Sequence, residues 1–438
     1  MLPSAYTKFN EKVLNFIWQN QYFNPDSLKT TSGQKLFVAR RGYLNLDEGP
    51  DFLEAKIKLD HIEWAGNIEI HMKSSDWYQH RHQGHKAYDN VILHVVYEHD
   101  EDIINKDGTL IPTLELHPFI SDQFIQKVIN IIHNRTFIAC ESFFPRIDKI
   151  IITSTLERAL IQRLEKKGTE IINLLKKNNG DWEETCYQVL SRNMGFKVNN
   201  ESFYKLAALC PLKNLLKLKG NQVGIEAYLF GMAGFLDQNI MFSKDDYVLE
   251  MNKEWHHLKS KFQIKYHLER HNWKFLRLRP ANFPTIRIAQ LASLINAYDS
   301  LFSHILEADS IEALKKIFKV KQSHYWQTHY DFEKQAKIKY ASTGESSVEN
   351  LIINTIAPLL TAYGKYKSDD TFLYKAISIL DEIEPEENNI IKKWETIGCT
   401  PRSAAESQGM IEQYNTNCLH RECLSCAIGY NVITGTDK

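Results

Sequence analysis

The spacing of the apolar residues changes along this chain of 438 residues, and the change limits the folds that are possible. Up to about residue 120 the apolar residues form short runs or alternate with polar ones, as in β-strands. Beyond residue 145 they recur every three or four positions over long stretches, as in helices. The sequence therefore predicts an α+β protein in which an α/β unit with a mixed sheet precedes a mainly helical body.

Two segments predict strands of the sheet. Residues 67–73 (NIEIHMK) alternate apolar side chains with Glu69, His71 and Lys73, so these three side chains leave one face of the strand. Residues 91–97 (VILHVVY) form a nearly continuous run of β-branched and apolar residues, which is typical of a strand buried on both faces.

The composition is that of an ordinary globular protein. Hydrophobic residues make up 43% and charged residues 24% of the chain, and the mean hydropathy is negative. No apolar run is long enough to span a bilayer, and the N-terminus lacks the apolar core of a signal peptide, so we expect a cytoplasmic protein with no membrane segment. The net charge of −1 neither indicates nor excludes a polyanionic partner.

The length exceeds the usual size of a single core, and we expect three parts. Residues 1–120 form the α/β unit, which begins with an amphipathic helix over 9–21. Residues 121–390 form the helical body, and residues 391–438 form a cysteine-rich metal-binding tail. A helix is predicted over about 121–139, and long helices are predicted over 156–177, 223–236, 285–298 and 347–366.

A set of charged residues in the first part predicts a divalent-metal site. Asp51 follows Gly49-Pro50 at the start of one strand, and Glu69 lies eighteen residues later on the next, the separation that a hairpin needs to bring two carboxylates together. Carboxylate oxygens are the ligands that Mg²⁺ and related cations prefer. A nearby lysine or histidine, here Lys73 or His71, can hold the attacking water or offset transition-state charge.

These residues resemble the PD-(D/E)XK phosphodiesterase superfamily, which has the restriction-endonuclease-like fold. The proline-aspartate is Pro50-Asp51, and the acid-X-lysine triplet corresponds to Glu69-Ile70-His71. His71 therefore stands at the usual lysine position, and Lys73 lies one alternation further along the same face. The resemblance implies a nuclease dependent on Mg²⁺ or Mn²⁺, with Asp51 and Glu69 as ligands. It leaves open whether Lys73 or His71 acts in place of the lysine, or whether catalysis is lost.

Histidines are dense immediately after this strand. His80, His82 and His85 lie in a short window, and His94 lies inside the predicted buried strand. An imidazole buried there without a partner costs about 1–3 kcal/mol, so we expect His94 to have a metal or a hydrogen bond as its partner. As a metal ligand, His94 would join Asp51, Glu69 and His82. Imidazoles suit Zn, Mn or Fe better than Mg²⁺, which gives a second hypothesis, a hydrolase of a small molecule. Exposed surface histidines are the alternative for His80 and His85.

An arginine-rich stretch in the helical body is a candidate for phosphate binding. Arg277, Arg279 and Arg287 lie around two prolines before and within a predicted helix. Arginine binds phosphate through two parallel hydrogen bonds, so we predict contacts with a nucleic-acid backbone. The alternative is that these arginines pair with acids at a junction between helices.

The tail contains four cysteines in the spacing C-x18-C-x4-C-x2-C, namely Cys399, Cys418, Cys423 and Cys426. Thiolates in such a segment hold structural Zn²⁺ or an iron–sulfur cluster. His420 competes with Cys399 as the fourth ligand, and four buried free cysteines are the alternative to a metal site. Some nucleases with the PD-(D/E)XK core are similar in having four cysteines around an iron–sulfur cluster, although there the ligands usually bracket the nuclease core.

Strings along the whole chain resemble an uncharacterised bacterial family, a domain of unknown function. They include NLDEGPDF, WAGNIEIHMKSSDW, YDNVILHVVYEHD, RLRPANFPTIRIAQLA and CLSCAIG. This resemblance implies no activity, so the functional prediction rests on the site. We expect a divalent-metal-dependent nuclease whose partner is nucleic acid, with DNA favoured over RNA. One alternative is an inactive nuclease-like scaffold that binds nucleic acid or protein. The other is the small-molecule hydrolase.

Overall fold

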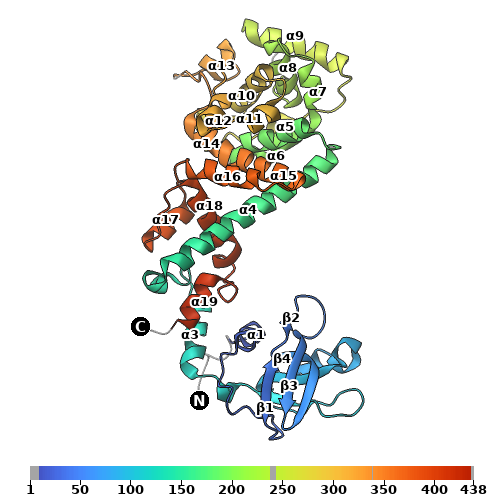
Figure 1. The fold of residues 1–438 in the computed structure, drawn as a ribbon. Coiled ribbons are helices and arrows are strands. Elements are labelled where there is room, and N and C mark those ends of the chain that lie inside the picture. The colour runs from blue at the N-terminus through green and yellow to red at the C-terminus, as the bar shows by residue number, and fades with distance from the viewer. Residues whose placement is uncertain (1–8, 237–242, 338, 436–438) are drawn as a thin grey trace. The chain divides into compact units, whose positions relative to one another are not determined.

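The computed structural model describes residues 9–236, 243–337 and 339–435 (Figure 1). The chain divides into two compact units. Unit 1 consists of Met1–Thr155, Lys392–Cys399 and Gln413–Lys438, and unit 2 consists of Leu156–Ile391 and Thr400–Glu412. In this division most of the predicted tail, residues 391–438, belongs to unit 1, together with the residues predicted to form the sheet.

Unit 1 contains a six-stranded mixed sheet, as the sequence predicts, so the protein is of the α+β class. Its strands are β1 (Leu36–Arg40), β2 (Tyr43–Leu44), β3 (Phe52–Leu59), β4 (Ile62–Lys73), β5 (Val91–Glu98) and β6 (Thr113–Glu115). The order is β1-β3-β4-β5-β6, with β2 beside β3. Strands β1, β2 and β4 run antiparallel to β3, whereas β4, β5 and β6 run parallel to one another.

The two strands predicted from residues 67–73 and 91–97 are confirmed as the end of β4 and most of β5. They lie side by side, and Glu69 on β4 is opposite His94 on β5. β5 is buried along nearly its whole length, as its apolar run predicts. The polar face of β4 is also covered, since Glu69 and His71 are only 5% and 1% exposed. Buried polar groups require partners, so this face is chemically constrained.

Four α-helices of unit 1 accompany the sheet: α1 (Glu11–Asn20), α2 (Asp76–Gln79), α3 (Asp122–Ile132) and α19 (Ala427–Thr434). Helix α1 packs against β4 (Figure 1). Its start is capped by Asn10, whose side chain accepts a hydrogen bond from the backbone N–H of Val13. Helix α3 ends before the predicted residue 139. The side chains of Asn134 and Thr136 there bond to the carbonyls of Ala139 and Ile138, an alternative to continued helix.

The remaining helices are mostly in unit 2 and confirm the predicted helical body. They are α4 (Lys149–Lys177), α5 (Trp182–Met194), α6 (Phe196–Leu209), α7 (Leu212–Leu216), α8 (Gln222–Met232), α9 (Asp246–Lys261), α10 (Pro284–Ala297), α11 (Leu301–Glu307), α12 (Ile311–Phe318), α13 (His324–Thr328), α14 (Glu345–Leu351), α15 (Ala357–Lys367), α16 (Thr371–Asp381), α17 (Asn389–Thr396) and α18 (Ala404–Gln413). A short hairpin, β7 (His329–Asp331) with β8 (Lys334–Gln335), lies among them.

Short 3-10 and π segments complete the secondary structure. The 3-10 turns are His82–Gly84, Lys86–Tyr88, His117–Phe119, Glu141–Arg146, Arg270–Asn272 and Pro280–Asn282, and the π segments are Ile352–Ile356 and Tyr414–Cys418. Close helix packing explains Gly231 of α8, where a Cβ would lie 2.1 Å from the ring of Trp255 on α9. Among the helices described, none is both long and apolar enough to cross a membrane.

Candidate metal centre

Asp51 and Glu69 are joined at the open end of the β3–β4 hairpin. The backbone N–H of Asp51 donates to Oε2 of Glu69 over 3.1 Å. The Asp51 carboxylate in turn accepts from the backbone N–H of Ile70 at 3.0 Å and from the side-chain amide of Asn15 at 3.2 Å. The two carboxylates predicted as metal ligands are therefore brought together, and each is held in one orientation by the other strand.

His71 is at the centre of a group of four side chains. Its Nε2 lies 3.1 Å from Nδ1 of His80 and 3.3 Å from Nε2 of His82. Oε1 of Glu69 lies 3.5 Å from Nε2 of His71 and 3.3 Å from Nε2 of His82. We call Glu69, His71, His80 and His82 the histidine centre.

The segment between β4 and β5 brings His80 and His82 to β4. Both follow the short helix α2, and Arg81 between them has a φ of +62°, which turns the chain so that two imidazoles two residues apart meet at one point. The ring of His82 is stacked on Tyr88 with centroids 3.9 Å apart, and Trp77 contacts it edge-on. These aromatic contacts fix the orientation of His82.

His94 lies behind His71 and is its hydrogen-bond partner. Nε2 of His94 is 2.7 Å from Nδ1 of His71, and both rings are buried. A histidine that binds metal through one ring nitrogen usually donates a hydrogen bond from the other. Of the two partners expected for His94, a metal or a hydrogen bond, the structure shows the hydrogen bond to His71, and metal ligation by His94 stays a prediction.

The ligand atoms of His71, His80 and His82 all lie within 4.8 Å of one another, close enough to share one cation, and Glu69 adjoins two of these histidines. Bonds of about 2.0–2.1 Å to a tetrahedral Zn²⁺ place neighbouring ligand atoms about 3.3 Å apart. The four separations run from Nε2 of His71 to His80, His82 and Glu69, and from Glu69 to His82. They are 3.1–3.5 Å, which agrees with this distance between neighbouring ligand atoms. Three imidazoles and a carboxylate favour Zn²⁺, Mn²⁺ or Fe²⁺ over Mg²⁺, since Mg²⁺ takes oxygen ligands.

Burial makes the charged forms of these groups costly when no cation is bound. Burial and the charge of Glu69 raise the pKa of Asp51 to about 7, and burial raises the pKa of Glu69 to about 8. Burial and the neighbouring histidines lower the pKa of His71 to about 2, and burial lowers the pKa of His94 to about 3. A divalent cation favours ionised carboxylate and neutral imidazole, so it would compensate both costs.

Lys73 does not point to this group, although it lies on the same strand. It is half-exposed at the end of β4, and its Nζ lies 3.8 Å from the carboxylate of Glu98. Of the two residues considered for the lysine role of the PD-(D/E)XK pattern, His71 is therefore the one that contacts Glu69.

The three arginines have different environments in unit 2. Arg277 and Arg279 are exposed. Arg287 is 2% exposed, and its guanidinium donates to Gln290, Asn282 and Ser347. Nη1 and Nη2 of Arg287 thus have acceptors within the protein, and the phosphate contacts of the three arginines stay predictions.

The cysteines predicted as a metal site belong to unit 1. Cys418, Cys423 and Cys426 are buried, with exposed fractions of 8–9%, whereas Cys399 is only half-buried.

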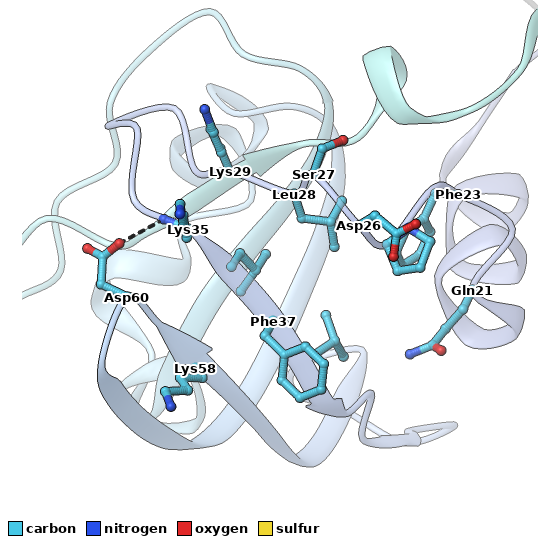
Figure 2. Close-up of a pocket in the computed structure, with 13 residues that line it drawn as sticks. Gln21, Phe23, Asp26, Ser27, Leu28, Lys29, Lys35, Phe37, Lys58 and Asp60 are labelled. Carbon is cyan, nitrogen blue, oxygen red and sulfur yellow. Dashed lines mark hydrogen bonds between the residues drawn. The ribbon is translucent and has the colours of Figure 1, made fainter.

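A separate cavity of about 690 Å³ in unit 1 lies between the chain after α1 and the edge strand β1 (Figure 2). Lys29, Lys35 and Lys58 contribute to its lining, and the backbone N–H of Lys35 donates to Asp60 across it. None of the predicted site residues lines this cavity.

The contacts of two residues with the site, Asn15 and His80, were not predicted from the sequence. Asn15 of α1 contacts Asp51, and no local motif marks an asparagine thirty-six residues away as a partner. For His80 a surface position was left as the alternative, because two histidines two residues apart share a face only on an extended segment. Arg81 between them has a left-handed backbone conformation, which brings the two imidazoles together, and the sequence does not reveal this conformation.

A family model described as a protein of unknown function (DUF2851) matches residues 11–389. The chain belongs to the DUF2851 family. No curated protein and no solved structure matches this DUF2851 member. The matched region contains all four residues of the histidine centre and ends before Cys418. Membership in DUF2851 therefore adds no activity, and a proposed function has to be argued from the geometry.

Proposed function

We propose that this protein is a metal-dependent hydrolase that cleaves phosphodiester bonds in nucleic acid, with DNA as the first expected substrate. The observation behind the proposal is the histidine centre, in which buried Glu69 and His71 meet half-buried His82 and exposed His80, with neighbouring ligand atoms 3.1–3.5 Å apart. Mn²⁺ is the cation we expect to support activity, because it accepts both the imidazoles of this centre and the oxygens of a phosphate.

The residues around the cation have distinct roles in this proposal. Glu69, His71, His80 and His82 hold the cation, which offsets negative charge on the phosphoryl oxygens. Asp51 orients Glu69 through its backbone N–H and presents a second carboxylate beside it. His94 keeps His71 in one orientation. The exposed Arg277 and Arg279 of unit 2 stay predicted contacts for the phosphate backbone.

The phosphodiester substrate is supported by the positions of the two carboxylates in the sheet. Asp51 immediately precedes β3, and Glu69 lies on β4, its antiparallel neighbour. This is the arrangement of the PD-(D/E)XK pattern that the sequence resembles. The departure from that pattern is the histidine at the lysine position, and His71 contacts Glu69.

A small-molecule hydrolase is the second candidate, and one observation favours it. The centre is rich in imidazole, and Glu69 and His71 are almost fully buried, which restricts the approach of a wide duplex. A single strand or a small phosphodiester reaches such a site more easily than intact double-stranded DNA.

The test is cleavage of labelled linear, circular and single-stranded DNA and of RNA with Mg²⁺, Mn²⁺ or Zn²⁺. We compare the wild type with Glu69→Ala and with Glu63→Ala, which removes an exposed glutamate from the same strand. The proposal predicts metal-dependent cleavage that Glu69→Ala abolishes and Glu63→Ala retains. Full cleavage by Glu69→Ala would refute the assigned site. No cleavage by the wild type, with hydrolysis of a small phosphodiester, favours the second candidate; neither activity favours an inactive scaffold.

A further inference from the structure

A fourth buried cysteine, Cys140, lies near the three buried cysteines of the C-terminal segment. It follows α3 in the sequence and is 8% exposed, compared with 9%, 8% and 9% for Cys418, Cys423 and Cys426. All four belong to unit 1, although Cys140 is far from the other three in the sequence. We call these four residues the thiol cluster.

Specific contacts bring the chain before Cys140 against the C-terminal segment. The ring of Phe137 is stacked on Tyr414 with centroids 4.2 Å apart and planes 8° from parallel. The guanidinium of Arg421 donates to the carbonyl of Thr136 and to the carbonyl of Cys418. The two stretches therefore have a defined relation at the point where the cysteines lie.

The four thiols interact electrostatically with one another. Burial and then the charges of Cys426 and Cys423 raise the pKa of Cys140 to about 12. Burial and then Cys140, Cys426 and Cys423 raise the pKa of Cys418 well above its usual range. Burial and then Cys426 raise the pKa of Cys423 to about 11. Cys140 is thus close enough to Cys418, Cys423 and Cys426 for their charges to interact, which places it beside these three residues.

Local geometry around two of these cysteines is also of the kind found at metal sites. The side-chain amide of Gln413 donates to Sγ of Cys426 at 3.1 Å, and hydrogen bonds to ligand sulfurs tune metal centres. Cys418 ends a π segment, Tyr414–Cys418, a widened turn that is frequent at functional sites.

The spacing of the sulfurs distinguishes between two kinds of centre. Bonds of about 2.3 Å to a single Zn²⁺ place tetrahedral sulfurs about 3.8 Å apart. Among the described residues, His71, His80 and His82 form a group with all ligand atoms within 4.8 Å, whereas the four sulfurs do not. An iron–sulfur cluster binds its thiolates to separate iron atoms and so holds them further apart than one ion does.

We propose that Cys140, Cys418, Cys423 and Cys426 bind an iron–sulfur cluster that ties the C-terminal segment to the chain after α3. The cluster replaces the predicted ligand Cys399 with Cys140, which is buried against the other three. It is a structural centre independent of the histidine centre and of the hydrolase activity proposed above. Soft thiolates bind iron–sulfur clusters or Zn²⁺, whereas the imidazoles and carboxylate of the histidine centre also accept Mn²⁺.

The first test uses the full chain, purified without oxygen and analysed before and after reconstitution with iron and sulfide. The proposal predicts about four iron and four sulfide per chain, with the visible absorption of a cluster and sulfur ligands in the iron-edge X-ray spectrum. Absence of iron and sulfide in both samples would overturn it. Zinc bound by the cysteines in place of iron would overturn it too.

The second test assigns the ligands with matched cysteine variants. Cys140→Ser and Cys426→Ser lose the iron, whereas Cys399→Ser and Cys186→Ser, the latter in the buried core of unit 2, retain it. Circular dichroism of each variant checks that the helices are retained. The ligand set is wrong if Cys399→Ser loses the iron and Cys140→Ser keeps it. The wild-type analysis above needs no variant, so it tests the cluster even if Cys140→Ser does not fold.

Discussion

The backbone N–H of Asp51 donates to Oε2 of Glu69, so the other oxygen of Glu69 lies against His71 and His82. One hydrogen bond between two neighbouring strands thereby sets the direction of the carboxylate that completes the histidine centre. The backbone N–H of Ile70 donates in turn to the carboxylate of Asp51. Each carboxylate therefore accepts a hydrogen bond from the backbone of the other segment, and the hairpin backbone positions the pair.

His94 is predicted to act through His71. Replacing it by phenylalanine keeps a ring of similar size but removes the 2.7 Å contact with Nδ1 of His71. Loss of such a supporting hydrogen bond weakens metal binding by about 10–100-fold, so we expect a drop of this size in the affinity for Mn²⁺ or Zn²⁺ by calorimetry. His61→Phe, at the exposed turn between β3 and β4, is the control. An unchanged affinity in His94→Phe would show that His71 needs no support.

Lys73 is predicted to be dispensable. It lies at the exposed end of β4 and pairs with Glu98 at the end of β5, and such a surface pair contributes less than about 1 kcal/mol. Lys73→Ala therefore retains the hydrolase activity and nearly all of the stability, whereas His71→Ala loses the activity. Rates measured on the same substrate decide the matter. A folded Lys73→Ala without activity would assign the lysine role to Lys73 after all.

Arg287 is predicted to stabilise unit 2. Its guanidinium donates to three acceptors and lies 4.6 Å from the ring centre of Phe196. Arg287→Ala leaves buried Gln290 without this donor and also removes the contacts with Asn282 and Ser347, which costs about 1–3 kcal/mol in the free energy of unfolding. Urea denaturation measures this cost, and Arg279→Ala, at an exposed site, should change it by less than about 0.5 kcal/mol. Equal effects of the two changes would contradict the buried placement.

Gly231 is predicted to tolerate no side chain. A Cβ there would meet the ring of Trp255 at 2.1 Å, so Gly231→Ala forces helices α8 and α9 apart or displaces the tryptophan. Overpacking of this kind costs about 1–3 kcal/mol. Gly344→Ala, where a Cβ meets nothing within 4 Å, is the matched control in thermal denaturation. A stable Gly231→Ala protein would mean that the two helices pack less closely.

The sequence predicted those parts of the fold that depend on periodicity. Alternation in residues 67–73 and the β-branched run before Tyr97 identified β4 and β5, since strand side chains repeat every two residues. The long helices followed from spacing of three and four. The end of α3 was missed because side chains of Asn134 and Thr136 bond to the backbone of the loop, a competition that periodicity does not reveal.

The site was predictable only where one strand determines it. Glu69 and His71 leave the same face of β4, so alternation was enough to group them. His80 and Cys140 depend on a left-handed residue and on contacts between distant segments, respectively, and no local pattern contains either. The burial of Arg287 was not predicted, because a charged residue in the sequence does not suggest that its helix, α10, is buried on nearly all sides.

The most direct test of the account is the titration of metal-free protein with Mn²⁺, which prefers nitrogen and oxygen donors and so reports on the histidine centre and not on the thiol cluster. Calorimetry compares the wild type with His82→Ala and with His61→Ala, a change at an exposed turn. We predict that the wild type and His61→Ala bind a single Mn²⁺ per chain and that His82→Ala binds it at least about tenfold more weakly. No Mn²⁺ or Zn²⁺ binding by the wild type, or equal affinity in all three proteins, would contradict the assignment of Glu69, His71, His80 and His82 as a metal centre.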